Sequence, residues 1–129
     1  MGERVESATA TWGTELRAEP GAPSDARIFL RSVLADRAAE ERVDTATLLA
    51  SELVSNAVVH GSRRRGSTIR VDARVRDDGL RIEVRDSGAG FDPNEALSRR
   101  GFGLRLVRDL SSRWGAEQGS SGCTVWFEL

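Results

Sequence analysis

Three short groups of residues in this sequence combine side chains and spacings that could do chemistry. The first is Glu52 with Asn56, a carboxylate and a carboxamide one helical turn apart. The second is the stretch Asp86–Gly90, which reads Asp-x-Gly-x-Gly at the end of an alternating apolar run. The third is the stretch Arg99–Gly103, two arginines followed by Gly-x-Gly. Each group suggests a way of holding a charged ligand.

The pattern Gly101-x-Gly103 is typical of a phosphate-binding site. Glycines let the backbone approach a ligand closely, and free amides at the start of a helix favour negative charge. A Gly-x-Gly can also form nothing more than a tight turn. In the same way, an aspartate followed by spaced glycines, as at Asp86, often marks a simple strand-to-loop turn. Taken singly, neither group decides between ligand binding and turn formation.

Glu52 and Asn56 lie in the clearest helical pattern of the chain, which we expect to run from a capping Asp44 to Gly61. The apolar residues that share their arc are Leu48, Leu49, Leu53 and Val59. The small hydroxyl residues form a separate stripe, which we expect to face water: Thr47, Ser51 and Ser55. Burying an unpaired polar group costs about 1–3 kcal/mol. The two groups therefore either receive a ligand or satisfy each other through hydrogen bonds.

The remaining pattern predicts a sheet covered by helices. We expect a strand over 7–16, a helix from a capping Ser24 to about residue 39, and a link at 40–42. Residues 69–76 and 80–85 alternate strictly between apolar and charged, which predicts a hairpin with one apolar and one charged face. Residues 91–100 are expected to form a loop or a short helical turn, and a helix from 101 to about 114 and a hairpin over 114–129 follow. The fold class is therefore an α+β two-layer sandwich, a mixed, mostly antiparallel sheet with about three helices on one face.

Composition limits the function further. The length of 129 residues fits one domain, 1–129, in which we expect residues 1–6 to be disordered. A net charge of −1 argues against nucleic acid and anionic membranes as partners. All 19 basic residues are arginine, and there is one cysteine and one histidine, which excludes a P-loop lysine and a multi-cysteine or His-rich metal site. No apolar stretch is long enough for a membrane span, so we expect a cytoplasmic protein.

The ordered set of motifs is more specific than any one of them. Glu-x-x-x-Asn-Ala, then Asp-x-Gly-x-Gly-Phe, then Gly-x-Gly-Leu resembles the Bergerat-fold (GHKL) ATPases, the superfamily of gyrase, histidine-kinase catalytic domains and mismatch-repair ATPases. The size, the short loop at 91–100 and the stretch Glu52–Gly61 most resemble the stand-alone anti-sigma-factor serine kinases of bacteria. The resemblance covers roughly residues 8–129.

That resemblance implies roles for individual residues. Asn56 would hold Mg²⁺ through its carboxamide oxygen, and Glu52 would be the base that takes the proton from an attacking hydroxyl. Asp86 would accept a hydrogen bond from the adenine amino group of ATP. Gly88 and Gly90 would let the backbone pass beneath the base.

The other implied contacts surround the phosphates and the adenine. The loop at 91–100 would be a short lid over ATP, in which Arg99 and Arg100 could stabilise charge on the transferred group. The phosphates would be wrapped by the backbone at the start of the next helix, Gly101, Phe102, Gly103 and Leu104. Thr124, on the final strand, would contact adenine through water.

The resemblance implies an ATP-dependent kinase that phosphorylates a serine of a small antagonist protein and sequesters a sigma factor, and it suggests a homodimer. The alternative is a non-catalytic module that holds ATP and binds a partner without phosphoryl transfer. A histidine-kinase catalytic domain is the third option, disfavoured because no helix carrying the phosphoaccepting histidine is found. The roles of His60 and of the basic loop Arg63–Arg65 stay open, and Cys123 is expected to be a small buried residue.

Overall fold

The computed structural model describes residues 9–61, 66–77, 79–86, 102–119 and 122–129. The elements run in the order β1 (Thr9–Arg17), α1 (Ala22–Leu34), α2 (Glu40–Asn56), the π-helix η1 (Ala57–Gly61), β2 (Thr68–Arg76), β3 (Gly79–Asp86), α4 (Phe102–Leu110), β4 (Arg113–Gly119) and β5 (Gly122–Glu128). The expectations for residues 1–6 and for the lid at 91–100 lie outside the described residues.

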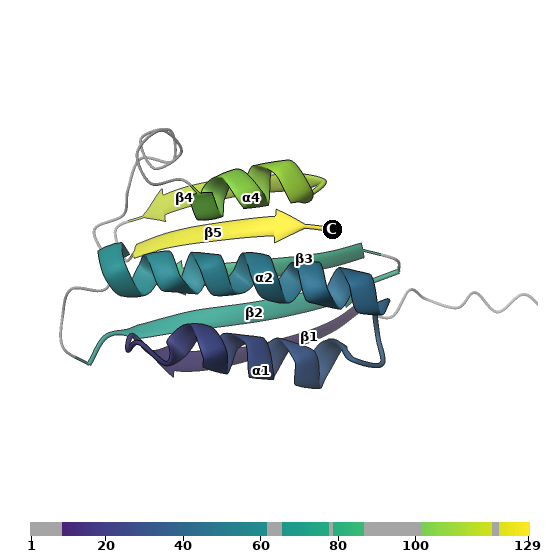
Figure 1. Ribbon diagram of the computed structural model, residues 1–129, viewed down its shortest axis with the longest axis horizontal. Coiled ribbons are helices and arrows are strands. Elements are labelled where there is room, and N and C mark those ends of the chain that lie inside the picture. The colour runs from purple at the N-terminus through teal and green to yellow at the C-terminus, as the bar shows by residue number, and fades with distance from the viewer. Residues whose placement is uncertain (1–8, 62–65, 78, 87–101, 120–121) are drawn as a thin grey trace, which may run out of the picture.

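The strands form one five-stranded sheet in the order β1-β2-β3-β5-β4, and all four pairings are antiparallel. The three α-helices in the described residues lie on the same face of this sheet (Figure 1), with α2 between α1 and α4. The predicted α+β two-layer architecture is confirmed.

The core lies between the helices and one face of the sheet. Alternate residues of β2 and β3, such as Val71 and Ile82, are buried there because successive side chains of a strand point to opposite faces. Phe127 on β5 is the largest of the fully buried side chains. The helices supply the opposing layer, with Leu30 from α1 and Leu104 from α4 fully buried.

The other face of the sheet, which we call the open face, carries the alternating charged residues. Its arginines in the described strands are Arg17, Arg70, Arg74, Arg76, Arg81, Arg85 and Arg113. Its carboxylates in the same strands are Glu15, Asp72, Glu83, Glu117 and Glu128. The strict alternation read from the hairpin therefore separates core from charge across the whole sheet.

The helices begin and end elsewhere than predicted. Helix α2 begins at Glu40, so residues 40–42 form its first turn and are not a link, and its N-cap is Ala39 with no side-chain cap. The first turn instead contains two glutamates, whose negative charges interact favourably with the positive end of the helix dipole. A prediction based on capping residues alone does not include this interaction. Helix α1 begins after Gly21, with no side-chain cap from Ser24, and ends at Leu34. Helix α4 ends at Leu110, and Trp114 belongs to β4.

The hydroxyl stripe of α2 does not face water, so that prediction is wrong. Thr47 is 2% exposed and Ser51 is 8% exposed, whereas Leu48 is 41% exposed and Val59 is 65% exposed. Small side chains let α1 and α2 approach closely. The Thr47 hydroxyl donates to the Asp44 carbonyl at 2.9 Å and accepts from the Arg31 guanidinium at 3.3 Å. Asp44, the predicted cap, instead forms an ion pair with Arg31 at 3.0 Å.

None of the helices in the described part of the chain has the length and apolar content that crossing a membrane requires.

Candidate functional site

The ends of three secondary-structure elements lie together at one end of the molecule. The last turns of α2, the carboxyl end of β3 and the first turn of α4 all lie at the left of Figure 1, where β5 also begins. Helix α2 packs against both β3 and α4. The end of α2 carries Glu52 and Asn56, the end of β3 carries Asp86, and the start of α4 consists of Phe102–Leu104. The topology therefore gathers parts of all three sequence motifs at one place.

Glu52 and Asn56 are half-buried on α2, beside the buried Leu49 and Leu53. No hydrogen bond joins Glu52 to Asn56, and neither side chain has a hydrogen-bond partner among the residues the structure describes. The alternative in which the pair satisfies itself is therefore not found. A carboxylate and a carboxamide stay available here to a ligand.

Directly after Asn56 the helix changes its geometry. The segment Ala57–Gly61 is a π-helix, and π-helical turns occur frequently at functional sites. Ala57 is buried and Val58 packs against the core, while Val59 is exposed. The side chain of His60 lies outside the described residues. The sequence signal for this turn is weak, because it consists of two consecutive β-branched valines, Val58 and Val59, which are weak helix formers.

Asp86 ends β3 and points to the helix-covered face. It is 6% exposed, and it stands opposite Ile69 on β2 and Cys123 on β5. Its direction follows from its alternation with the buried Ile82 and Val84. A carboxylate is buried next to the end of α2, where the resemblance puts an adenine.

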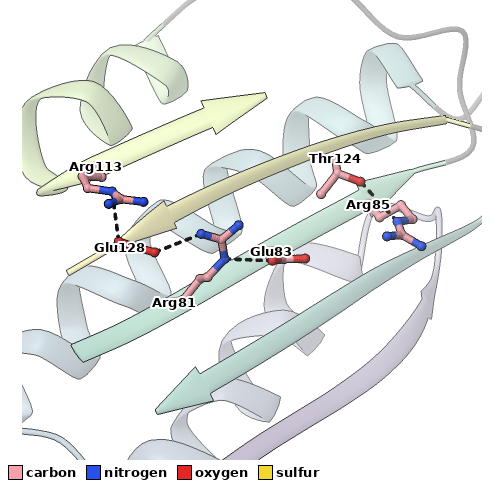
Figure 2. A network of polar contacts seen from close by, with 6 residues as sticks. All are labelled: Arg81, Glu83, Arg85, Arg113, Thr124 and Glu128. Atoms are coloured by element: carbon pink, nitrogen blue, oxygen red, sulfur yellow. Dashed lines mark hydrogen bonds and ion pairs between the residues drawn. The ribbon is translucent and has the colours of Figure 1, made fainter. Parts of the chain in front are cut away.

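Thr124 does not join Asp86. It stands opposite Arg85, and its hydroxyl accepts a hydrogen bond from Arg85 Nε at 3.2 Å on the open face (Figure 2). Cys123, which is 1% exposed, occupies the position directly across from Asp86. Counting back by twos from the core residues Phe127 and Val125 puts Cys123 on the inner face, and this signal was available in the sequence.

Helix α4 presents its amino end to the same region. Phe102 and Gly103 form its first turn together with Leu104, which is fully buried in the core. Leu104 therefore anchors the start of the helix, so a ligand there would meet backbone amides. The predicted residues that lie outside the described ranges are Gly88, Gly90, Arg99, Arg100, Gly101 and Arg63–Arg65.

A divalent cation at this site would need few protein ligands. Within the described ranges no group of three His, Cys, Asp or Glu residues could hold a metal ion. Mg²⁺ commonly keeps several waters and is held by one or two protein oxygens together with substrate phosphates. A single carboxamide with no hydrogen-bond partner in the described structure, as at Asn56, fits that mode of binding.

Comparison with known proteins agrees with this arrangement. Residues 16–129 match the family model described as "Histidine kinase-like ATPase domain". The anti-sigma F factor of Clostridium acetobutylicum is 34% identical over 105 residues, which cover 69% of this chain and 73% of that protein.

Two solved structures resemble the fold. The RsbU and RsbW domains of Rv1364c from Mycobacterium tuberculosis match with a TM-score of 0.73 and 26% identity over 92% of this chain and 32% of that chain. The blue-light activated histidine kinase EL346 of Erythrobacter litoralis matches with a TM-score of 0.55 and 27% identity over 67% of this chain and 30% of that chain. This chain thus spans about a third of each of those longer proteins.

The family model covers most of the chain, and the anti-sigma F factor exceeds 30% identity over more than two thirds of it. The chain belongs to the histidine kinase-like ATPase domains of the Bergerat-fold (GHKL) superfamily, and within it to the anti-sigma-factor group.

Proposed function

We propose that this protein binds Mg-ATP at the end of the molecule where α2, β3 and α4 meet, and that it phosphorylates a serine of a small antagonist protein. The observation that carries the proposal is the pair Glu52 and Asn56, one turn apart, half-buried and without a hydrogen bond to each other. Family membership supports ATP as the ligand. The likeness to an anti-sigma F factor supports a sigma factor and its antagonist as partners.

The proposed reaction is a transfer of the γ-phosphoryl group. The serine hydroxyl oxygen attacks the γ-phosphorus, the bond from that phosphorus to its bridging oxygen breaks, and ADP leaves with the bond electrons. Glu52 accepts the hydroxyl proton. The amides at the start of α4 stabilise the phosphate charge. Mg²⁺ held by Asn56 would neutralise charge on the phosphate oxygens.

Regulation follows from competition between two partners. The protein holds a sigma factor, the unphosphorylated antagonist displaces that sigma factor, and phosphorylation of the antagonist restores the hold. The runner-up function is an ATP-dependent binding module that transfers no phosphate. The side chain of Glu52 discriminates between the two functions, because a pure binder needs no base at that position.

The test is Glu52→Gln, incubated with labelled ATP and candidate antagonist proteins encoded near this gene. We expect the parent protein to label a partner serine, and the variant to lose about a hundredfold or more of the rate, a typical share for a general base. Nucleotide affinity by isothermal titration should stay close to that of the parent protein, because Glu52 is not expected to hold the phosphates.

Glu41→Gln is the matched control, because Glu41 lies in the first turn of α2, at the other end of the same helix. Undiminished transfer by Glu52→Gln would refute the role of a base. ATP binding with no labelled partner would favour the binding module. A folded parent protein that binds no ATP would refute both functions.

A further inference from the structure

The open face concentrates positive charge that the chain as a whole does not have. The chain carries 20 acidic and 19 basic residues. On the described strands of the open face, seven arginines accompany five carboxylates. The sheet therefore presents a basic surface on the side away from the helices and the proposed ATP site.

The carboxylates of this face are largely engaged by arginines. Arg81 forms ion pairs with Glu83 at 2.8 Å and with Glu128 at 2.9 Å, and Arg113 meets Glu128 at 3.2 Å (Figure 2). Arg70 pairs with Asp72 at 3.1 Å. Burial by itself lowers the pKa of Arg81, but the hydrogen bonds that Arg81 donates to Glu83 and Glu128, together with the negative charges of these two groups, outweigh it and raise that pKa. Each of these three carboxylates therefore has an arginine partner on the same face.

Four open-face arginines have no carboxylate partner in the described part of the chain, and two of them, Arg74 and Arg85, lie between the paired groups. Arg74 stands directly opposite Arg81, and Arg85 stands directly opposite Arg70, an arrangement of like charges that costs stability. No carboxylate in the described part of the chain pairs with Arg74 or Arg85. Each keeps guanidinium donors for an external acceptor, Arg85 having used one on Thr124.

The Trp126 side chain lies on the same face, between Gly115 and the guanidinium of Arg81. A Cβ atom on Gly115 would come within 2.8 Å of the Trp126 indole, so the ring lies directly over that glycine. The Arg81 guanidinium is 4.0 Å from the ring centroid, and that of Arg113 is 5.8 Å away. An aromatic ring held in place in this way contributes contact area at little entropic cost, as at the centres of protein interfaces.

We propose that the open face is a docking surface for an acidic, extended segment of a partner protein, with carboxylates on Arg74 and Arg85 and an apolar side chain on Trp126. Arg74 lies opposite Arg81, and Arg85 lies four residues further along β3. Arg74 and Arg85 are therefore separated by about 13 Å along the strand direction. Two acidic residues four positions apart in an extended segment match that separation.

The charge pattern disfavours the two other occupants. Neighbouring β2 and β3 carry an Arg70–Arg85 row, an Asp72–Glu83 row and an Arg74–Arg81 row. Suppose that a second copy covered this face, related to the first by a two-fold axis in the plane of the sheet and with its rows aligned. Arginines would then lie on arginines and acids on acids, which opposes association. A nucleic acid would bring its phosphates against the row of acids.

The test uses a fluorescein-labelled peptide with glutamates four positions apart and a leucine midway, read by fluorescence anisotropy at low and high salt. We expect binding that weakens at high salt, and an increase in Kd of about tenfold or more in the double variant Arg74→Gln/Arg85→Gln. The matched control is Arg27→Gln/Arg108→Gln, two arginines on α1 and α4, which should bind like the parent protein. An unchanged urea unfolding transition shows that the double variant is folded.

Several outcomes would overturn the proposal. These are equal binding of a peptide with glutamine in place of glutamate, unchanged affinity in the double variant, and displacement of the peptide by single-stranded DNA. A dimer seen by sedimentation that the double variant dissociates would assign the face to a second copy instead. Failure of ATP binding would refute the proposed function and leave this result standing, because the two surfaces lie on opposite sides of the sheet.

Discussion

Asp86 is the only carboxylate among the described residues that is buried. Its position at the last residue of β3 puts a negative group at the end of the sheet where α2 ends and α4 begins. The neighbouring side chain across the strand pair is the Cys123 thiol. The inner surface there is thus one carboxylate beside one small apolar group, which suits a flat base that donates a hydrogen bond.

We predict that Asp86→Asn lowers ATP affinity by about tenfold and narrows the preference for ATP over GTP. In the proposed site the carboxylate would accept a hydrogen bond from the adenine amino group, whereas an amide of the same shape accepts less strongly and can donate instead. Isothermal titration with both nucleotides measures the change. Asp72→Asn, on the open face, is the control, and equal ATP affinities for the two variants would remove Asp86 from the base site.

Residue types and spacing select Glu52, Asn56 and Asp86 as candidates, and the helical and strand periods predict where these residues lie in their elements. The face of Thr124 was predicted from a motif and not from the period. The alternation of Phe127 and Val125 assigns the inner position to Cys123, and the structure agrees. The motif match alone therefore selected Thr124, whereas the strand alternation shows that its neighbour Cys123 lies on the same face as Asp86.

At the scale of elements, the contact between α1 and α2 depends on small side chains. Ala46 and Ala50 on α2 are fully buried, as are Ala26 and Leu30 on α1. Thr47 lies in the same stripe and is held by Arg31 from the neighbouring helix. The polarity of the hydroxyls predicted a wet face, whereas their size made the face suitable for helix packing.

We predict that Thr47→Val lowers the free energy of unfolding by about 1 kcal/mol, because the isosteric change leaves the Arg31 donor and the Asp44 carbonyl without a buried partner. Urea unfolding followed by circular dichroism measures it. Thr45→Val is the matched control, since the exposed Thr45 makes the same kind of bond to the Glu41 carbonyl at 3.0 Å, and its cost should stay within about 0.5 kcal/mol. Equal costs would contradict a role for burial.

Element types were readable from the sequence, but their ends were less so. Strict alternation predicts the strand ends well, and each end of β2 and β3 lies within one residue of its predicted position. Helix starts were placed by capping side chains, and neither α1 nor α2 has a side-chain cap hydrogen bond. The first turns are fixed instead by Pro23, whose ring favours that position in α1, and by two glutamates in α2.

At the scale of the whole molecule, the two layers divide the surface into distinct regions. One end carries the proposed nucleotide site, and the open face carries the proposed docking surface. Binding of a ligand to the folded state alone must raise the stability of the whole domain.

We predict that Mg-ATP at a hundred times its Kd stabilises the domain by about 2.7 kcal/mol and raises Tm by roughly 10 °C. In Asn56→Ala the Mg²⁺-dependent part of this shift should disappear, while a smaller shift with ATP alone remains. Scanning calorimetry with and without Mg²⁺ measures both. A parent protein that melts at the same temperature with and without Mg²⁺ at equal ATP would contradict the role of Asn56.

The strand order also determines when this chain can fold during synthesis. Strand β5 comes after every other described element in the sequence, yet it lies between β3 and β4, and Leu129 and Leu80 exchange backbone hydrogen bonds. Until residues 122–129 have left the ribosome, the edge of β3 has no strand to pair with, and an unpaired edge is a template for aggregation. A chain that ended at residue 119 would therefore carry α1, α2 and α4 beside an unfinished sheet, which makes it a natural substrate for chaperones and proteases.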